Sequence, residues 1–235
     1  MRGAIGTPRE NYADLMEEVM TIMGPVMIGP SSSHTAGPLK LAFAARELFG
    51  VPIMSARIVL GGSLGATGKG HGTPQAVVAG LMGWASDDRR VPRALELARS
   101  SGLKFEVVYA PKLGNHPNEM SIDLTGDDPQ TMRLRGASLG GGKVQLLSVD
   151  GFKVSLFGTF PTLIVYMLDR PGVIAGVTGL LSERDLNVAF MSVARKRKGE
   201  DALMSIEMDD DLDDDLIERV GQLRQVKRVR VMSPL

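Results

Sequence analysis

Strand-like and helix-like segments alternate through the last third of the chain, and their order limits the folds that it can adopt. Short apolar runs end at turn residues and are followed by segments in which apolar residues recur at helical spacing. The expected order is strand 162–168, helix 173–184, strands 187–195 and 202–208, helix 212–223 and strand 228–232. This β-α-β-β-α-β order predicts a ferredoxin-like unit, a fold that hosts many functions and indicates none by itself.

The preceding residues predict a separate α+β unit. Helical patterns cover residues 11–23 and 39–49, and a period-two strand over 53–60 places on one face Met54, Ala56, Ile58 and Leu60. Two further helices are expected at 73–84 and 92–100, followed by strands at 105–109, 120–124, 131–135, 144–149 and 152–157. Strands at hairpin spacing favour an antiparallel sheet. The pattern changes near residue 159, which divides the chain into domains 1–159 and 160–235.

Charge and composition exclude several classes of partner and site. The 235 residues carry 27 basic and 27 acidic side chains, so no global field attracts nucleic acid or an anionic membrane. No segment has the pattern of a signal peptide or a membrane span, and we expect a cytoplasmic protein. Because the sequence contains no cysteine, these residues form no disulfide and hold no thiolate-bound iron–sulfur or zinc centre. We expect no metal ligands among them.

Residues 29–38 form the most unusual polar segment of the chain. Two Gly-Pro pairs bracket a run of hydroxyl and imidazole side chains, which are Ser31, Ser32, Ser33, His34 and Thr35. Pro38 suits the first turn of the helix expected over 39–49, which Gly50 would terminate. A polar loop that enters a helix N-terminus favours an anion such as a phosphate or a carboxylate. A solvated, serine-rich helix cap is the alternative of equal weight.

A Gly-rich loop is expected over residues 61–72, directly before the helix that Thr73 would cap and Pro74 would begin. It presents Lys69 and His71 between glycines. Such a loop lets a substrate approach closely and lets the imidazole act as an acid, a base or a carboxylate ligand. The alternative is a tight turn with a surface histidine.

Two further loops carry polar groups. His116 and Asn118 lie between expected strands, where the asparagine amide offers both a donor and an acceptor. Gly140, Gly141 and Gly142 predict either a backbone nest for an anion or a β-bulge between two strands. Neither loop is specific by itself.

An acidic run covers residues 209–215, directly before the last expected helix. It lacks the glycine and the terminal glutamate of an EF-hand calcium loop. Because aspartate is favourable at a helix N-terminus, we interpret the run as a solvated helix start rather than a metal site.

The four polar clusters occur together, and in this order, in the iron–sulfur-dependent L-serine dehydratases. The motifs are MIGPSSSHTAGP at 27–38, TGKGHGT at 67–73, HPN at 116–118 and GGG at 140–142. The chain resembles the separate β subunit of that family from about residue 19 onward. By this resemblance, the first domain is similar to the allosteric-substrate-binding domain of some phosphoglycerate dehydrogenases and the second to an ACT domain.

The resemblance implies conversion of L-serine to pyruvate and ammonia. In that family a [4Fe–4S] cluster, with one iron that no cysteine holds, binds the substrate and acts as a Lewis acid on the leaving hydroxyl. Since this chain has no cysteine, the cluster would belong to a partner α subunit, without which the chain would be inactive. By the same resemblance His71, His116 and Asn118 handle the substrate, while residues 31–35, Lys69 and residues 140–142 line the same region.

Some ACT domains bind serine with His and Asn around the first turn and another Asn at the start of the second strand. Here Asn187 matches the last position, Asp169 and Gly172 lie in the first turn, and Met167 replaces the histidine. A ligand would find fewer partners. We therefore expect self-association through this domain, with serine regulation as the alternative.

A free-standing, amino-acid-binding regulatory protein is the competing hypothesis for the whole chain. The dehydratase is favoured because its loop motifs are matched more fully than the ligand positions of an ACT sensor. A sensor would bind an amino acid alone, whereas a subunit requires its α partner.

Overall fold

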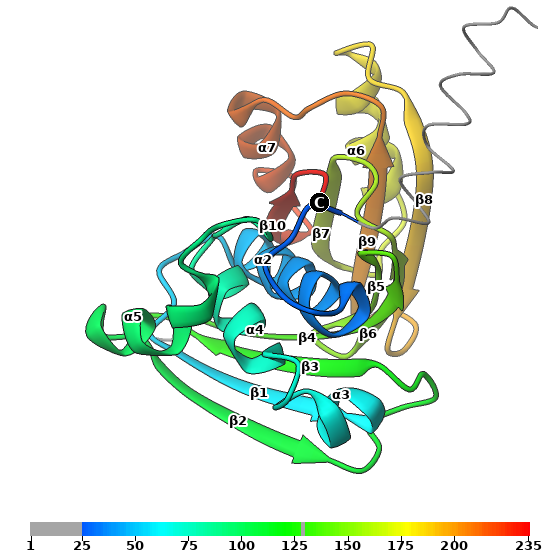
Figure 1. Ribbon diagram of the computed structural model, residues 1–235. Helices are drawn as coiled ribbons and strands as arrows, with labels where there is room; N and C mark the ends of the chain where they lie inside the picture. The colour runs from blue at the N-terminus through cyan, green and yellow to red at the C-terminus, as the bar shows by residue number, and fades with distance from the viewer. Residues whose placement is uncertain (1–24, 128–129) are drawn as a thin grey trace, which may run out of the picture.

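The computed structural model describes residues 25–127 and 130–235. Within these ranges the chain forms a six-stranded sheet and a four-stranded sheet, each with its own helices (Figure 1). The predicted α+β class is therefore confirmed. The helix expected over residues 11–23 lies outside the described residues.

The first sheet has the strand order β2-β1-β3-β4-β5-β6. Its strands are β1 Ser55–Gly61, β2 Lys104–Ala110, β3 Glu119–Thr125, β4 Thr131–Gly140, β5 Lys143–Val149 and β6 Phe152–Leu156. All neighbours pair antiparallel except β1 and β2, which are parallel. The expectation of an antiparallel sheet thus needs one refinement, because the long helical connection from β1 to β2 permits a parallel crossover.

Helices α2, α4 and α5 gather on one face of the first sheet (Figure 1). A π-helical turn at Ser32–Ala36 leads into α2 Gly37–Phe49, which is followed by α3 Gly62–Thr67, α4 Thr73–Leu81, a 3₁₀ turn at Val91–Arg93 and α5 Ala94–Ser100. Helix α2 lies on β4 and β5, and α4 packs beside α2. Their apolar side chains and those of the sheet form one core.

Two segments that we expected to be loops are partly helical. Residues 32–36 form the π-helical turn that continues into α2, and part of the Gly-rich stretch forms α3. Thr73 is the first residue of α4 rather than its cap, because Gly72, with a φ of 69°, occupies the N-cap position. The same helix ends at Leu81 rather than at residue 84, since Gly83 has a φ of 79° that helical backbone does not allow.

The expected strands are found, with local differences. Strand β1 buries Ala56, Ile58 and Leu60 as the period-two pattern predicts. Met54 precedes the strand and is 50% exposed, because β1 begins at Ser55 rather than at the predicted residue 53. Strand β4 continues to Gly140, beyond the predicted end at residue 135.

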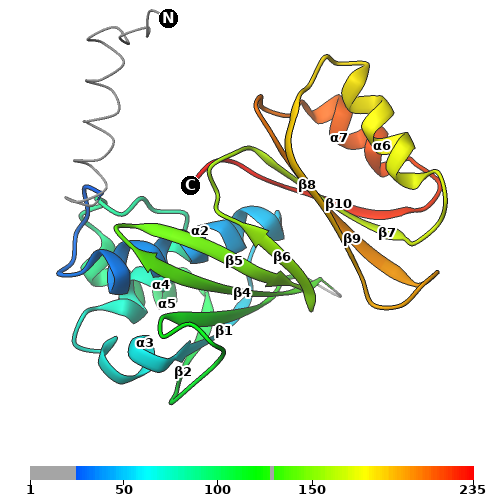
Figure 2. The same cartoon turned by 90° about the vertical axis from the view of Figure 1, so that its right-hand side faces the viewer.

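The second sheet has the order β10-β7-β9-β8, which confirms the predicted β-α-β-β-α-β unit. Its elements are β7 Thr162–Leu168, α6 Val173–Ser182, β8 Val188–Arg195, β9 Asp201–Met208, α7 Asp214–Gly221 and β10 Val226–Met232. Figure 2 shows α6 and α7 on the face turned away from the first unit. Asp213 caps α7 by accepting a hydrogen bond from the Leu216 N–H, as expected for the acidic run.

The other face of the second sheet packs on the first unit. Ile164, Leu203 and Met232 belong to the same apolar cluster as the core of the first sheet. At this contact Arg230, only 6% exposed, donates hydrogen bonds to the carbonyls of Leu48 (2.5 Å) and Phe49 (3.0 Å). A cation at the C-terminus of α2 is favourable because the last carbonyls of a helix lack partners. The boundary near residue 159 stays a prediction; the chain passes between the sheets after Leu156 and before Thr162.

Helix α2 packs against its neighbours at glycine contacts. A Cβ on Gly80 of α4 would lie 2.2 Å from the Leu39 carbonyl oxygen. A Cβ on Gly136 of β4 would lie 2.4 Å from a methyl carbon of Leu41. Only glycine permits this approach, so these positions set the distance of α2 from both α4 and the sheet.

Gly37 of α2 lies close to Ser138 of β4, and this contact allows a test of the packing. A Cβ on Gly37 would lie 2.0 Å from the Oγ of the fully buried Ser138, so Gly37→Ala should lower the free energy of unfolding by about 1–3 kcal/mol in urea titrations. Gly179→Ala in α6 is the control, because no atom lies within 4 Å of its Cβ position; it should be neutral or stabilising by up to about 1 kcal/mol. Ser138→Gly should rescue Gly37→Ala. Equal effects of the two alanine variants would contradict the close packing.

The buried guanidinium between the two units yields a second test. Arg230→Met keeps much of the side-chain volume but leaves the carbonyls of Leu48 and Phe49 without donors, so it should lower the free energy of unfolding by about 1–3 kcal/mol. Arg228→Met, at an exposed position of the same strand, should change it by no more than about 0.5 kcal/mol. A fully stable Arg230→Met variant would show that the two units do not depend on this contact.

Candidate functional site

The two histidine-bearing segments of the N-terminal region lie against each other. The ring centroids of His34 and His71 are 4.8 Å apart. The Thr73 hydroxyl donates to the His34 carbonyl (2.6 Å), and the Thr35 hydroxyl donates to the His71 carbonyl (3.2 Å). Each segment therefore supplies a hydroxyl that holds the backbone of the other.

Hydroxyl groups surround the His34 ring. Its Nδ1 lies 3.1 Å from Ser33 Oγ, and its Nε2 lies 3.0 Å from Ser63 Oγ in the first turn of α3. Ser31 caps the π-helical turn, because its Oγ accepts a hydrogen bond from the His34 N–H (3.2 Å). Burial and the nearby His71 lower the pKa of His34, while a hydrogen bond with Ser63 opposes them. The net lowering favours a neutral imidazole at pH 7.

Ser63, which contacts the His34 ring, also contacts the loop that contains His116 and Asn118. The Ser63 N–H donates to the Pro117 carbonyl (2.7 Å), which ties the turn at 116–118 to the N-terminus of α3. The Asn118 N–H donates to Nδ1 of His116 (3.1 Å). In the neutral ring, Nδ1 is then the acceptor and Nε2 carries the proton.

The Glu119 side chain stabilises the turn at residues 116–118. Glu119 is 3% exposed, accepts a hydrogen bond from the His116 N–H (2.8 Å) and forms an ion pair with Arg135 (2.7 Å). Burial raises the pKa of Glu119, but the His116 N–H and Arg135 outweigh burial, and the net pKa lies below its usual range. The Glu119 carboxylate, whose ionised form these contacts favour, therefore holds the His116 backbone in place.

Two buried oxygens beside this turn lack partners among the described residues. They are Oδ1 of Asn118 and Oγ of Ser138, and the Ser138 N–H donates to the Asn118 carbonyl (3.0 Å). Buried polar atoms are nearly always hydrogen-bonded, so this pair marks unused binding capacity.

A cavity of about 220 Å³ opens beside His71. Its walls include Gly29, Pro30, Thr35, His71 and Gln75, from both histidine segments. The volume suits a small molecule. No group of three or more His, Cys, Asp or Glu side chains that could hold a metal ion occurs in residues 25–127 and 130–235.

Other predicted residues lie farther from the histidines or have different contacts. Ser32 begins the π-helical turn, and its carbonyl accepts the Gly37 N–H. Lys69 is exposed on the turn after α3. The three glycines have φ values of 94°, 59° and 76° and form the tip of the β4–β5 hairpin, namely Gly140, Gly141 and Gly142. The register of β4 and β5 shifts beside them, as at a β-bulge, and the backbone nest stays a prediction.

The residues predicted for ACT regulation are not brought together within one chain. Asp169 accepts hydrogen bonds from Arg195 and from the Gly199 N–H, both 3.0 Å, and these contacts hold its pKa below the usual range. Asn187 donates to Asp209 (2.6 Å) at the opposite end of β8, a strand of eight residues. Gly172 is the N-cap of α6, with a φ of 90°.

Sequence reasoning missed Ser63, Glu119 and Ser138. Ser63 stands in the Gly-rich stretch directly after two glycines, and Glu119 directly follows the HPN motif. Their positions beside recognised motifs were the only available signal. Ser63 contacts His34 and Pro117, 29 and 54 positions away, and Glu119 contacts Arg135, 16 positions away.

Comparison with protein families gives two matches. Residues 20–100 match the family described as "Serine dehydratase beta chain", and residues 161–225 match the family described as "ACT domain". None of the helices in the described part of the chain is long and apolar enough to cross a membrane.

Individual relatives cover most of the chain. It is 38% identical over 211 residues to the probable L-serine dehydratase beta chain of Bacillus subtilis, covering 90% of this chain and 96% of the relative. It is 32% identical over 197 residues to the L-serine dehydratase beta chain of Peptoniphilus asaccharolyticus, covering 83% and 88%. A D-3-phosphoglycerate dehydrogenase of Synechocystis is 25% identical over 219 residues, which span 92% of this chain and 38% of that protein.

The coupling between the two imidazoles can be measured by titration. Because His71 lowers the pKa of His34, His71→Gln should raise that pKa toward its ordinary value of about 6.5, as followed by NMR of labelled imidazoles. Lys69→Gln, a change of an exposed charge close in sequence to His71, should leave it unchanged. In the wild type, the unfolded chain takes up this proton first, so the free energy of unfolding should fall as the pH drops below about 6.5. A His34 pKa that is the same in the wild type and in His71→Gln would contradict the electrostatic coupling of the two rings.

Proposed function

The chain belongs to the L-serine dehydratase beta-chain family, and we propose on this premise that it is the β subunit of an enzyme that converts L-serine to pyruvate and ammonia. The convergence of the segments around His34, His71 and His116 carries the proposal. These segments are far apart in sequence, yet Ser63 contacts both the His34 ring and the 116–118 turn. In this proposal, the imidazole and amide groups would act on one small polar substrate.

The hydrogen bonds of His71 suit it to remove a proton. Its Nδ1 lies 2.9 Å from the Thr67 carbonyl oxygen, which only accepts, so the neutral ring carries its proton on Nδ1. The lone pair of Nε2 is then free to take the α-proton of serine as a general base. Departure of hydroxide from the β-carbon of the resulting carbanion, which becomes water on protonation, gives aminoacrylate. Aminoacrylate tautomerises to an imine, and hydrolysis of the imine yields pyruvate and ammonia.

His116 has the opposite tautomer and the opposite role. Its Nδ1 accepts from the Asn118 N–H, so Nε2–H is a donor. We assign that donor, together with the Asn118 side chain, to holding the carboxylate or the amino group of the substrate. His34, kept neutral, positions His71 and Ser63 rather than reacting.

The [4Fe–4S] cluster implied by the resemblance does not fit this chain. The sequence contains no cysteine, and residues 25–127 and 130–235 bring together no other set of metal ligands. We therefore assign the cluster to a second, α chain. In this arrangement the β chain contributes the histidines and Asn118 but is inactive alone.

The regulatory-protein alternative is not favoured. Two relatives named as dehydratase beta chains align with more than four-fifths of this chain. The ACT residues that would bind an amino acid, Asp169 and Asn187, are already paired with Arg195 and Asp209.

Reconstitution tests the assignment of the reaction. The chain is co-expressed anaerobically with a cysteine-bearing α chain, and pyruvate formation from L-serine is assayed. His71→Gln should lower kcat by about 100-fold or more, as expected for loss of a general base. His116→Gln should act mainly by raising KM. Arg197→Gln, on an 82% exposed side chain of the second unit, should leave both constants unchanged.

Two outcomes would overturn parts of the proposal. Dehydration of serine by this chain alone would refute the need for an α chain. Unchanged kcat and KM in His71→Gln would refute the site, even if the pair of chains is active.

A further inference from the structure

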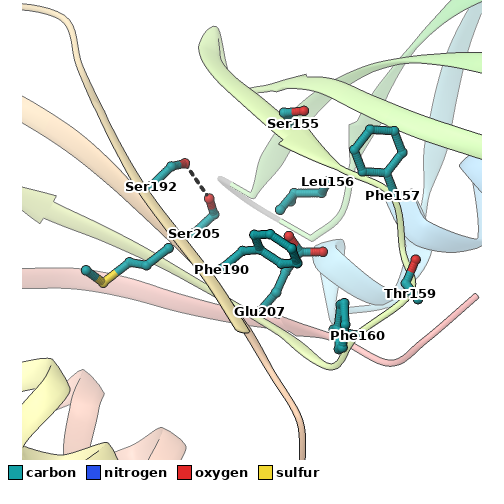
Figure 3. A pocket seen from close by; sticks show the side chains of 10 residues that line it. Ser155, Leu156, Phe157, Thr159, Phe160, Phe190, Ser192, Ser205 and Glu207 are labelled. Carbon is teal, nitrogen blue, oxygen red and sulfur yellow. Dashed lines mark hydrogen bonds between the residues drawn. The ribbon is translucent and has the colours of Figure 1, made fainter. Parts of the chain in front are cut away.

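A cavity lies between the two units, on the side away from the histidines. It has a volume of about 460 Å³ and shares no residue with the cavity beside His71. Its walls come from β6 and the segment after it, and from the face of β8 and β9 that α6 and α7 leave open (Figure 3). A volume of this size accommodates a small organic molecule.

Glu207 is the charged group of this cavity. Its side chain extends from β9 into the space beneath Phe190 (Figure 3), and the residue is only 5% exposed. Within the described residues its carboxylate has no hydrogen bond and no ion pair, and burial raises the pKa of Glu207. Burial disfavours the ionised form of this carboxylate, and a cation bound in the cavity would supply the partner that it lacks.

Aromatic rings frame the entrance. Phe157 and Phe190 are 50% and 62% exposed, which is unusual for phenylalanine in a folded chain. The rings of Phe160 and Phe190 lie 5.9 Å apart at an angle of 59°. Ring faces next to a carboxylate attract a cation and its apolar body at the same time.

Three of the four hydroxyl groups in the walls are already engaged, and Thr159 carries the fourth. The hydroxyls of Ser192 and Ser205 hydrogen-bond to each other at 2.9 Å, and Ser155 accepts from the Gln145 amide at 2.9 Å. No Lys, Arg or His from the described ranges lines the cavity. An anion, or the carboxylate of a free amino acid, would therefore find no opposite charge here.

We propose that this cavity binds a small organic cation, a primary amine with an apolar body. The ammonium group lies on the Glu207 carboxylate, and the body packs against the rings of Phe157, Phe160 and Phe190. The charge of the walls excludes carboxylates, and the exposed rings supply the apolar contact. This site is separate from the proposed serine chemistry, so either can fail without the other.

Calorimetry on the full chain tests the proposal with phenethylamine as the probe. The amine should bind saturably at one site, whereas its anionic counterpart 3-phenylpropionate should not bind. Glu207→Gln should weaken amine binding about tenfold or more, the effect expected for loss of a charge-assisted hydrogen bond. Phe190→Ala should weaken it about threefold or more.

A matched variant controls for charge in the same unit. Glu200→Gln removes an exposed carboxylate at the turn between β8 and β9, outside the cavity, and should leave amine binding unchanged. Glu207→Gln removes a buried charge without loss of volume, so its melting temperature at pH 8 should equal or exceed that of the wild type. This measurement shows that lost binding does not reflect lost folding.

Several results would overturn the proposal. They are an absence of saturable amine binding, equal binding by wild type and Glu207→Gln, and equal binding of the amine and the carboxylate. A dimer in analytical ultracentrifugation that Phe190→Ser dissociates, with no amine binding by the resulting monomer, would instead assign the exposed rings to a second copy of the chain.

Discussion

Helix α2 joins the two halves of the molecule, because both of its ends are engaged and its sides pack at glycine contacts. Its first turn continues the π-helical segment that contains His34, and its last carbonyls accept hydrogen bonds from the guanidinium of Arg230. Thirteen residues span about 20 Å, so one rigid rod connects the histidine segments to the second sheet. Gly80 and Gly136 leave that rod little freedom to shift, since larger side chains would overlap Leu39 and Leu41.

The interface between the two units contains two buried charged side chains, which differ in their hydrogen bonds. Arg230 has two carbonyl acceptors and lies 5.6 Å and 5.8 Å from the ring centroids of Phe49 and Tyr166. The Tyr166 hydroxyl donates to Asp150 at 2.6 Å, while Nε and Nη2 of Arg230 have no hydrogen-bond partner among the described residues. The Glu207 carboxylate has no hydrogen bond at all among these residues. One charge therefore fixes how the units meet, while the other is unsatisfied within the chain and makes the adjoining cavity selective for cations.

The sequence predicts the second sheet well because each of its signals is local. Period-two strands, the Asp213 cap and the turn before Gly172 are short-range features. Helix α3 is different, because its residues are mostly poor helix formers. It exists because Gly62 and Gly65 approach the backbone of Pro117 and Ala110, contacts that no local pattern reveals. The same holds for the site: the histidines stand out in the sequence, whereas Ser63 gains its role only through partners brought in by the fold.

The arrangement of the imidazoles sets how many protons the site can hold. With ring centroids 4.8 Å apart, His34 and His71 disfavour simultaneous charging, and His34 is the ring whose pKa is lowered. A positive charge on His71 therefore disfavours a second positive charge on His34, whose ring lies between the hydroxyls of Ser33 and Ser63. His116 is separated from this pair by the Ser63–Pro117 contact and keeps its own tautomer through Asn118. Under the proposed function, His71 and His116 would supply one acceptor and one donor nitrogen on different loops, as removal of an α-proton from a held amino acid would require.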